Sequence, residues 1–244
     1  MGGNHDPDTG PDTGEGKANT KGTAMRLFLD TADIEEIRTI NRWGVLKGVT
    51  TNPTLVAKTR EDAERVWHEI LSEVDGDVSL ETTEDEPDAM YKQGVALAGY
   101  GENAVVKVPM TPAGLEAGRR LTQDGIRVNV TLVFSPAQAI LAAEIGAYIV
   151  SPFLGRIDDA ASDGMHILRQ ICELYATQGY TTQVLAASLR HPMHVVDAAI
   201  AGADIATMPY EVFERLVHHP LTDLGLERFR ADWSKLQHEL KGEG

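Results

Sequence analysis

The chain has 244 residues, of which 42% are hydrophobic and 24% charged, and its formal net charge is −15. This length fits one domain or two small ones, and the composition is typical of a soluble globular protein. No apolar run approaches the roughly 18 residues of a membrane span, and the acidic charge argues against binding nucleic acid. A single cysteine, Cys172, excludes an intrachain disulfide and a cysteine-based zinc site, and it fits a reducing cytoplasm.

Residues 1–24 differ in composition from the rest of the chain. They are rich in glycine, and after Met1 they contain no apolar residue larger than alanine. Such a segment cannot bury enough surface to offset the entropy of ordering it, and it lacks the apolar stretch of a signal peptide. We therefore predict a disordered N-terminal tail or a cloning remnant at 1–24, followed by one catalytic domain with a C-terminal helix at 25–244.

Short apolar, β-branched runs recur eight times after the tail, and stretches with helical periodicity separate them. Turn residues flank each run, as expected for buried parallel strands. A helix is predicted after Asp33, which begins a capping box with Glu36, and another over 55–74. The predicted strands are 26–30, 47–50, 77–81, 104–108, 127–131, 147–151, 183–187 and 204–208.

Proline marks the junctions between strands and helices. Five prolines each follow a strand and precede a helical stretch, where the missing N–H costs no hydrogen bond: Pro53, Pro112, Pro136, Pro192 and Pro209. Eight strand–helix units in about 220 residues match the size of a TIM (β/α)8 barrel. The alternative is a doubly wound open sheet. That fold usually carries a glycine-rich phosphate loop after its first strand, and here this position reads Asp30-Thr-Ala-Asp33.

Polar residues gather at the predicted C-terminal ends of the strands, where a TIM barrel carries its functional groups. Burial of charged groups in such a place is costly unless they are paired or used. We predict that one cavity collects them. The residues are Asp30, Asn52, Glu81, Lys107, Asn129, Thr131, Ser151 and Ser188.

Lys107 is the most informative of these residues, because apolar residues surround it in the run Ala-Val-Val-Lys-Val-Pro. Desolvation favours the neutral amine of a lysine, and a neutral amine is a nucleophile toward carbonyl groups, with which it forms a Schiff base. The alternative is a lysine with a purely structural ion pair to Glu81 or Asp30.

Two arginines suggest an anionic ligand. Arg156 follows the sixth predicted strand, and Arg190 follows the seventh, beside Ser188. Arginine matches the geometry of phosphate oxygens, and late loops of a barrel often bind phosphate. His191 and His194 lie three residues apart, but no third ligand is near in the sequence, so we predict no metal site.

Seven motifs occur in an order that resembles transaldolase, and more closely the short transaldolases related to bacterial fructose-6-phosphate aldolase. The resemblance covers residues 25–235. The motifs are LFLDTAD (27–33), GVTTNP (48–53), SLE (79–81), VVKVPMT (105–111), NVTLVFS (129–135), SPFLGR (151–156) and ASLRHP (187–192).

The resemblance implies a role for each candidate residue. Lys107 would form the Schiff base, and Asp30 would act as the general acid and base for C3–C4 cleavage. Glu81 would activate a water molecule that Thr131 orients. Asn52 and Asn129 would hydrogen-bond the hydroxyls of the dihydroxyacetone fragment, and Ser151 would line the same cavity. Arg156, Ser188 and Arg190 would bind the sugar's phosphate. The resemblance further implies no cofactor, a place in the pentose phosphate pathway, and a homo-oligomer such as a pentamer or a decamer.

Two positions separate transaldolases from aldolases within this family. The aldolases carry glutamine where Glu81 stands and tyrosine where Phe134 stands. This chain therefore resembles a transaldolase, in which Phe134 offers no proton and keeps the pocket drier. The alternatives that stay open are an aldolase proper, a barrel that only binds a sugar phosphate, and a transaldolase for a sulfonated ketose.

Overall fold

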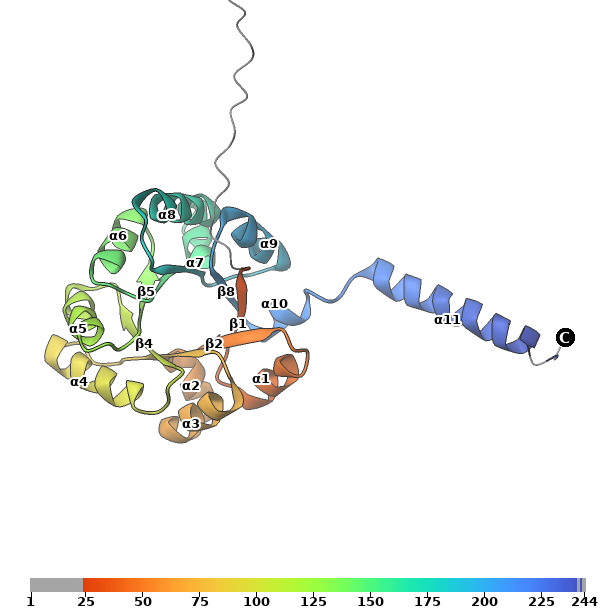
Figure 1. Cartoon of the computed structure of the whole chain (residues 1–244), viewed down its shortest axis with the longest axis horizontal. Helices are drawn as coiled ribbons and strands as arrows, with labels where there is room; N and C mark the ends of the chain where they lie inside the picture. Colours follow the sequence, from red (N-terminus) through yellow and green to blue (C-terminus); the bar gives the residue numbers. More distant parts are fainter. Residues whose placement is uncertain (1–23, 241, 243–244) are drawn as a thin grey trace, which may run out of the picture.

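Eight parallel strands form one closed barrel. The structure, a computed structural model, describes residues 24–240 and 242, so the predicted tail lies outside it except for Ala24. Strands pair in chain order from β1 to β8, and β8 pairs with β1. Helices surround the strands on the outside (Figure 1). The fold is therefore the predicted TIM (β/α)8 barrel and not the open sheet.

The strands are β1 (Arg26–Asp30), β2 (Leu46–Thr50), β3 (Asp77–Glu81), β4 (Ala104–Pro109), β5 (Val128–Val133), β6 (Ile149–Pro152), β7 (Gln183–Ala186) and β8 (Ile205–Met208). The helices are α1 (Ile34–Asn41), α2 (Pro53–Thr59), α3 (Ala63–Glu73), α4 (Pro87–Ala98), α5 (Pro112–Gln123), α6 (Pro136–Glu144), α7 (Leu154–Asp159), α8 (Gly164–Gln178), α9 (Pro192–Ala201), α10 (Tyr210–Glu214) and α11 (Pro220–Leu240).

Proline begins most of the helices that follow a strand. Pro53, Pro112, Pro136 and Pro192 are the first residues of α2, α5, α6 and α9, as predicted, whereas Pro209 precedes α10. The prediction of one helical stretch over 55–74 was wrong. Arg60 adopts a left-handed conformation (φ 58°) that ends α2, and the Asp62 side chain then caps α3 by accepting from the Arg65 N–H.

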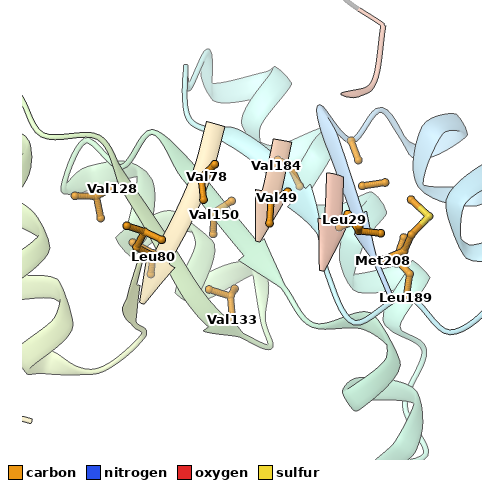
Figure 2. Packing of buried hydrophobic residues seen from close by; sticks show 14 of the residues in the cluster. Leu29, Val49, Val78, Leu80, Val128, Val133, Val150, Val184, Leu189 and Met208 are labelled. Atoms are coloured by element: carbon orange, nitrogen blue, oxygen red, sulfur yellow. The ribbon is translucent and has the colours of Figure 1, made fainter. Parts of the chain in front are cut away.

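Two apolar clusters hold the barrel together. The larger lies between the strands and the surrounding helices, where Val78, Val128 and Val150 belong to it (Figure 2). The smaller fills the barrel interior with the side chains of Phe28, Val105, Ile149, Leu185, Ala187 and Ile205. Gly48 makes room for this filling, since a Cβ there would lie 2.4 Å from the Phe28 ring. The interior is therefore packed, and polar groups can gather only at its ends.

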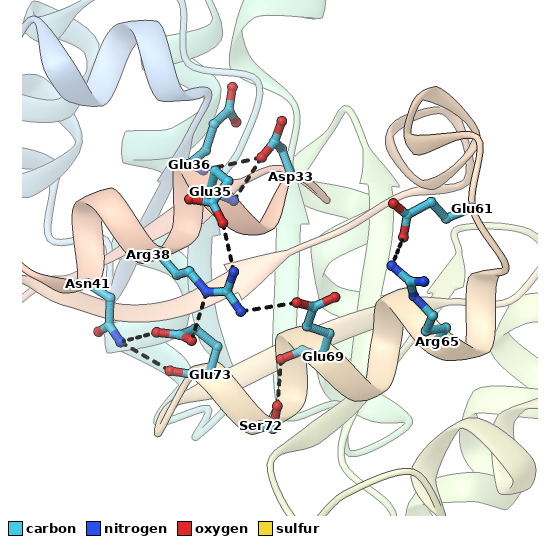
Figure 3. A network of polar contacts seen from close by, with 10 residues as sticks. All are labelled: Asp33, Glu35, Glu36, Arg38, Asn41, Glu61, Arg65, Glu69, Ser72 and Glu73. Atoms are coloured by element: carbon cyan, nitrogen blue, oxygen red, sulfur yellow. Dashed lines mark hydrogen bonds and ion pairs between the residues drawn. The ribbon is translucent and has the colours of Figure 1, made fainter.

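A network of charges joins α1 to α3 on the outer surface (Figure 3). The Arg38 guanidinium contacts Glu35 on its own helix and Glu69 and Glu73 on α3. The predicted capping box is only half formed: the Asp33 side chain accepts from the N–H groups of Glu35 and Glu36, but the Glu36 carboxylate accepts from the Thr31 hydroxyl. Partly exposed pairs of this kind add little stability, so the network mainly sets how α3 lies against α1.

Helix α11 projects away from the barrel (Figure 1). None of its residues is buried. Five apolar side chains at spacings of three and four residues form a stripe along it: Leu226, Phe229, Trp233, Leu236 and Leu240, which are 43–79% exposed. Neither α11 nor any other helix of the described residues is long and apolar enough to cross a membrane.

Candidate active site

Strand register aligns the predicted site residues at the C-terminal end of the barrel. Glu81 on β3 pairs with Lys107 on β4, and Lys107 pairs with Asn129 on β5. Paired residues of neighbouring parallel strands point to the same face of a sheet. Asp30 on β1 is likewise paired with Thr50 on β2. The register thus places charged and polar groups from five successive strands at one end.

A hollow of about 100 Å³ opens at this end, and we call it the catalytic hollow. Six of the predicted site residues line it: Asp30, Asn52, Lys107, Ser151, Arg156 and Ser188. Its lining is Asp30, Thr50, Asn52, Lys107, Ser151, Phe153, Arg156, Leu185, Ala187, Ser188 and Thr207.

Lys107 is buried and held by two oxygen atoms. Its Nζ lies 2.8 Å from Glu81 Oε2 and donates to the Thr51 carbonyl at 3.0 Å. The Lys107 side chain is 5% exposed and that of Glu81 is 15% exposed. The ion pair that the sequence left open as an alternative is therefore present. It also puts a carboxylate within proton-transfer distance of the amine.

Asp30 shares the hollow with Lys107 and takes part in a hydroxyl chain. Thr50 Oγ1 donates to Asp30 Oδ1 at 2.7 Å, and the Thr207 hydroxyl lies 2.7 Å from Thr50 Oγ1. Because Thr50 spends its one proton on Asp30, Thr207 must donate to Thr50. Burial raises the pKa of the Asp30 carboxyl, while Lys107 and the Thr50 hydrogen bond oppose that rise. A carboxyl with a raised pKa exchanges protons more readily near neutral pH.

Asn129 and Ser151 form a fixed polar pair on β5 and β6. Ser151 Oγ donates to Asn129 Oδ1 at 2.6 Å, and Asn129 Nδ2 donates to Ser79 Oγ at 3.1 Å. All three side chains are fully or almost fully buried. The side chain of Asn52 is fixed differently, because its Oδ1 caps α2 by accepting from the Leu55 N–H at 3.0 Å. The Asn52 amide nitrogen is left to donate to a ligand.

Thr131 lies near these groups with its hydroxyl unsatisfied. It is fully buried, and its Oγ1 has no hydrogen-bond partner among the described residues. A buried hydroxyl without a partner is costly and marks a place for a water molecule or ligand. The next residue, Leu132, has a left-handed backbone (φ 59°), and the β5–β6 register shifts at that point. Such a bulge re-aims side chains at the end of a strand.

Two of the three predicted anion-binding residues belong to the hollow. Arg156 and Ser188 line it, and the Arg156 guanidinium lies 5.0 Å from the centroid of the Phe153 ring. Arg190 lies outside the lining, where its Nη2 pairs with Asp159 Oδ2 at 2.6 Å. Phe134 also lies outside the lining and contacts Phe153, with 6.1 Å between the ring centroids.

A second, more apolar hollow of about 360 Å³ adjoins the first. Both are lined by Asn52, and the second also includes Glu81 and Trp67. The Trp67 indole N–H is buried and has no hydrogen-bond partner among the residues described. The Lys107–Glu81 ion pair therefore joins residues of two different hollows, Lys107 of the first and Glu81 of the more apolar second.

Sequence reasoning missed Thr50, Thr207 and Phe153. Both threonines are polar residues inside otherwise apolar buried strands, the same signal that identified Asn129 and Thr131. Phe153 gave no signal, because a phenylalanine after a strand is ordinary core material. Over residues 24–240 and 242, no group of three or more His, Cys, Asp or Glu side chains is arranged to hold a metal ion.

Comparison with known proteins gives a consistent result. The model of the family described as "Transaldolase/Fructose-6-phosphate aldolase" matches residues 27–240. A "Probable transaldolase" of Aquifex aeolicus is 53% identical over 212 residues, which are 87% of this chain and 98% of that protein. Another, from Roseiflexus sp., is 54% identical over 214 residues, with 87% and 99% covered.

A solved structure resembles the fold without sharing the sequence. The chain aligns with a thiamine phosphate pyrophosphorylase from Pyrococcus furiosus with a TM-score of 0.53 and 17% identity, over 79% of this chain and 93% of the other. At this identity the likeness shows the barrel alone.

Proposed function

The chain belongs to the transaldolase/fructose-6-phosphate aldolase family, and we propose that it transfers a dihydroxyacetone unit between sugar phosphates through a Schiff base on Lys107. The donors would be fructose 6-phosphate or sedoheptulose 7-phosphate, and the acceptor an aldose phosphate, in the cytoplasmic pentose phosphate pathway. One observation carries the proposal: a buried lysine in contact with a carboxylate shares a hollow with a second carboxyl group.

The first step is attack of the Lys107 amine on the ketose carbonyl. In the proposal the Lys107 ammonium first gives a proton to Glu81, whose Oε2 lies 2.8 Å away. Addition gives a carbinolamine, which loses water to form the iminium ion. The buried Thr131 hydroxyl supports a site for that water, held between Thr131 and Glu81.

The second step breaks the C3–C4 bond. In the proposal Asp30 removes the proton of the C4 hydroxyl, the bond electrons move into the iminium, and an aldose phosphate leaves. The three-carbon enamine remains on Lys107. The raised pKa of Asp30 suits a group that must accept a proton and later return it to the new hydroxyl of the product. The Thr207–Thr50 chain keeps the carboxyl oriented through Oδ1.

The remaining residues bind parts of the substrate. The Asn52 amide and the Ser151–Asn129 pair suit the hydroxyls of the dihydroxyacetone fragment, because their other polar atoms are already fixed by the protein. Arg156 and Ser188 suit the phosphate, and Arg190 would join them from the rim. With a net charge of −15 the surface as a whole repels a phosphorylated sugar, so local positive groups must capture it.

Trapping with borohydride tests the Schiff base. We expect borohydride and fructose 6-phosphate together to leave a three-carbon adduct on Lys107, found by peptide mapping. Lys47, an exposed lysine on strand β2, is the control and should remain unmodified. An adduct on another residue, or none, would leave Lys107 with only the structural role that its ion pair with Glu81 offers.

The aldolase alternative is tested by acceptor dependence. Glu81 and Phe134 support transfer, because neither adds a phenol that could protonate the enamine in the hollow. We expect fructose 6-phosphate to be consumed with erythrose 4-phosphate present and to be nearly stable without it. Rapid release of free dihydroxyacetone without an acceptor would identify an aldolase. A sulfonated ketose used in preference to the phosphate would revise the donor.

We also propose that the chain forms a homo-oligomer in which α11 packs on a second copy. The apolar stripe of α11 supports this, because a soluble helix buries such a stripe against something, and none of α11 is buried within its own chain. Exposed Phe229 and Trp233 are the largest side chains on the stripe.

Light scattering after gel filtration measures the assembly. We expect Trp233→Glu to dissociate it, because the charge would be buried in the contact. Lys235→Glu places the same carboxylate on the opposite face of the helix, with a larger change in net charge, and should leave the mass unchanged. A wild-type protein that runs as a monomer, or a Trp233→Glu protein that keeps the wild-type mass, would rule out this contact.

A further inference from the structure

We propose that His194 is a positioning residue for the anion-binding end of the site, and that it acts only as the neutral imidazole. This inference rests on the proposed function, since it concerns the residues assigned to the phosphate. His194 lies in the first turn of α9, is 8% exposed, and has no place in the hollow itself. It acts on residues 188–190, which we call the anion loop.

The His194 ring joins the anion loop to α7. Its Nδ1 accepts from the Arg190 backbone N–H at 3.3 Å, and its Nε2 lies 3.4 Å from Asp158 Oδ2. A ring nitrogen that accepts a hydrogen bond carries no proton, so this arrangement assigns the proton to Nε2. Asp158 is itself anchored, because its Oδ1 accepts from the Gly164 N–H at 2.8 Å.

The surroundings of the ring favour its neutral form. Burial lowers the pKa of His194 and the neighbouring His191 lowers it further, whereas Asp158 and Asp197 oppose the change. The two histidine rings are 3.8 Å apart between centroids. Besides these groups, Arg190 faces the ring from the anion loop, and Asp159 on α7 pairs with that arginine. Protonation of Nδ1 would turn the acceptor for Arg190 into a donor.

The anion loop needs such support because its backbone is strained. Ser188 has a left-handed conformation (φ 59°), which is costly for a residue with a side chain and persists only where neighbours enforce it. On one side the Ser188 carbonyl accepts from the Gly155 N–H at 3.0 Å. A Cβ at Gly155 would lie 2.2 Å from that carbonyl, so only glycine permits the approach. His194 holds the other end of the anion loop by accepting the hydrogen bond from the Arg190 N–H.

Two substitutions separate the functions of the two ring nitrogens. Asparagine places its Oδ1 where Nδ1 stands, so His194→Asn keeps the acceptor for Arg190. Glutamine reaches only the position of Nε2, so His194→Gln loses it. We expect His194→Gln to raise KM for fructose 6-phosphate about tenfold, the factor that one hydrogen bond represents, with kcat within about twofold of wild type. His194→Asn should stay within about threefold of the wild-type KM.

The pH profile gives a readout that a purely structural residue would not change. Wild-type KM for fructose 6-phosphate should rise on acidification as the imidazole gains its second proton, and His194→Asn should lack that component. The same sugar phosphate is used with both proteins, so a component present in the wild-type profile and absent from that of His194→Asn reports His194. Calorimetry with inorganic phosphate involves no turnover. It should show that the wild type and His194→Asn bind phosphate more tightly than His194→Gln does.

The outcomes distinguish this inference from the proposed function. If Arg156→Ala leaves KM and the affinity for inorganic phosphate unchanged, the anion does not bind at this end and both proposals on it fail. If Arg156→Ala weakens both while His194→Gln matches the wild type, the anion site stands and the role of His194 is wrong. Equal losses of kcat and melting temperature in His194→Asn and His194→Gln would likewise overturn it.

Discussion

Two aspartates at opposite ends of the barrel illustrate different uses of the same side chain. Asp77 begins β3 and Asp30 ends β1, so the parallel strands place them at opposite ends. The Asp77 carboxylate accepts from Arg26 at 2.8 Å, Arg127 at 2.5 Å and the Tyr148 hydroxyl at 3.1 Å. Asp30 accepts from one hydroxyl, that of Thr50, and otherwise faces the hollow that holds Lys107.

The difference lies in how much bonding capacity each carboxyl retains. At the N-terminal end both oxygens of Asp77 are occupied by fixed donors, and Gln183 further fixes Arg26. At the C-terminal end a carboxyl has a raised pKa, and the Thr131 hydroxyl has no partner within the part of the chain that the structure describes. A satisfied cluster can only stabilise the fold, whereas unsatisfied groups retain the capacity to bind substrate. Variants at the two ends should therefore separate stability from activity.

The largest expected effect is on turnover at the C-terminal end. Lys107→Ala removes the proposed nucleophile, so we expect kcat to fall by at least about a thousandfold in a coupled assay with fructose 6-phosphate and erythrose 4-phosphate. The melting temperature should fall as well, because the Glu81 carboxylate, whose side chain is 15% exposed, loses its partner, so turnover is compared per folded molecule below the melting transition. Lys47→Ala, on β2, serves as the control with full activity. Near-normal turnover in folded Lys107→Ala would remove the covalent mechanism.

The second effect concerns stability at the N-terminal end. Asp77→Ala removes the acceptor of Arg26, Arg127 and Tyr148, and the loss of these charge-assisted hydrogen bonds to a nearly buried carboxylate costs about 3 kcal/mol. For a chain of this size that lowers the melting temperature by roughly 6–12 °C. Turnover per folded molecule should be unchanged at low temperature. A loss of kcat comparable to that of Lys107→Ala would show that the two ends are not independent.

The sequence was sufficient to predict the barrel and six of the residues that line the hollow containing Lys107. Periodic apolar runs and proline at the junctions specify alternating strands and helices, and a charged residue inside a buried strand stands out without any structure. Register was not predictable in this way, and it is register that pairs Glu81 with Lys107 and Asp30 with Thr50.

The sequence also did not allow contacts between distant loops to be predicted. Arg190 stays a predicted anion ligand, and the pairing of its guanidinium with Asp159 on α7, 31 residues away in the chain, is a contact that the sequence does not indicate. His194 was considered only as a metal ligand, because the hydrogen bond from the Arg190 N–H depends on how α9 begins. The exposed stripe of α11 could not be predicted either, since exposure depends on where the helix packs.

The third prediction concerns the pH dependence of stability. A raised pKa means that folded Asp30 holds its proton more tightly than the unfolded chain does, so ionisation at neutral pH costs stability. Asp30→Asn removes that cost and should be more stable than wild type by roughly 1 kcal/mol at pH 7, while losing activity. The advantage should shrink as the pH falls through the raised pKa toward 3.8, because wild-type Asp30 is then protonated as well. Melting curves across this range measure it, and an advantage independent of pH would contradict the assignment.

The smallest expected effect is at Phe134, on the rim of the C-terminal end. Its ring contacts Phe153, which lines the hollow, and it is 38% exposed. Phe134→Tyr introduces a phenol that can donate a proton toward the enamine, so we expect release of free dihydroxyacetone without acceptor to rise by up to about tenfold. The gain is limited because the side chain reaches the hollow only through Phe153. Phe134→Leu is the control that removes the ring without adding a donor. If Phe134→Leu releases as much dihydroxyacetone as Phe134→Tyr, then Phe134 acts by keeping water out and proton donation is not involved. The Phe134–Phe153 contact would then be what protects the unsatisfied polar groups at this end of the barrel from water.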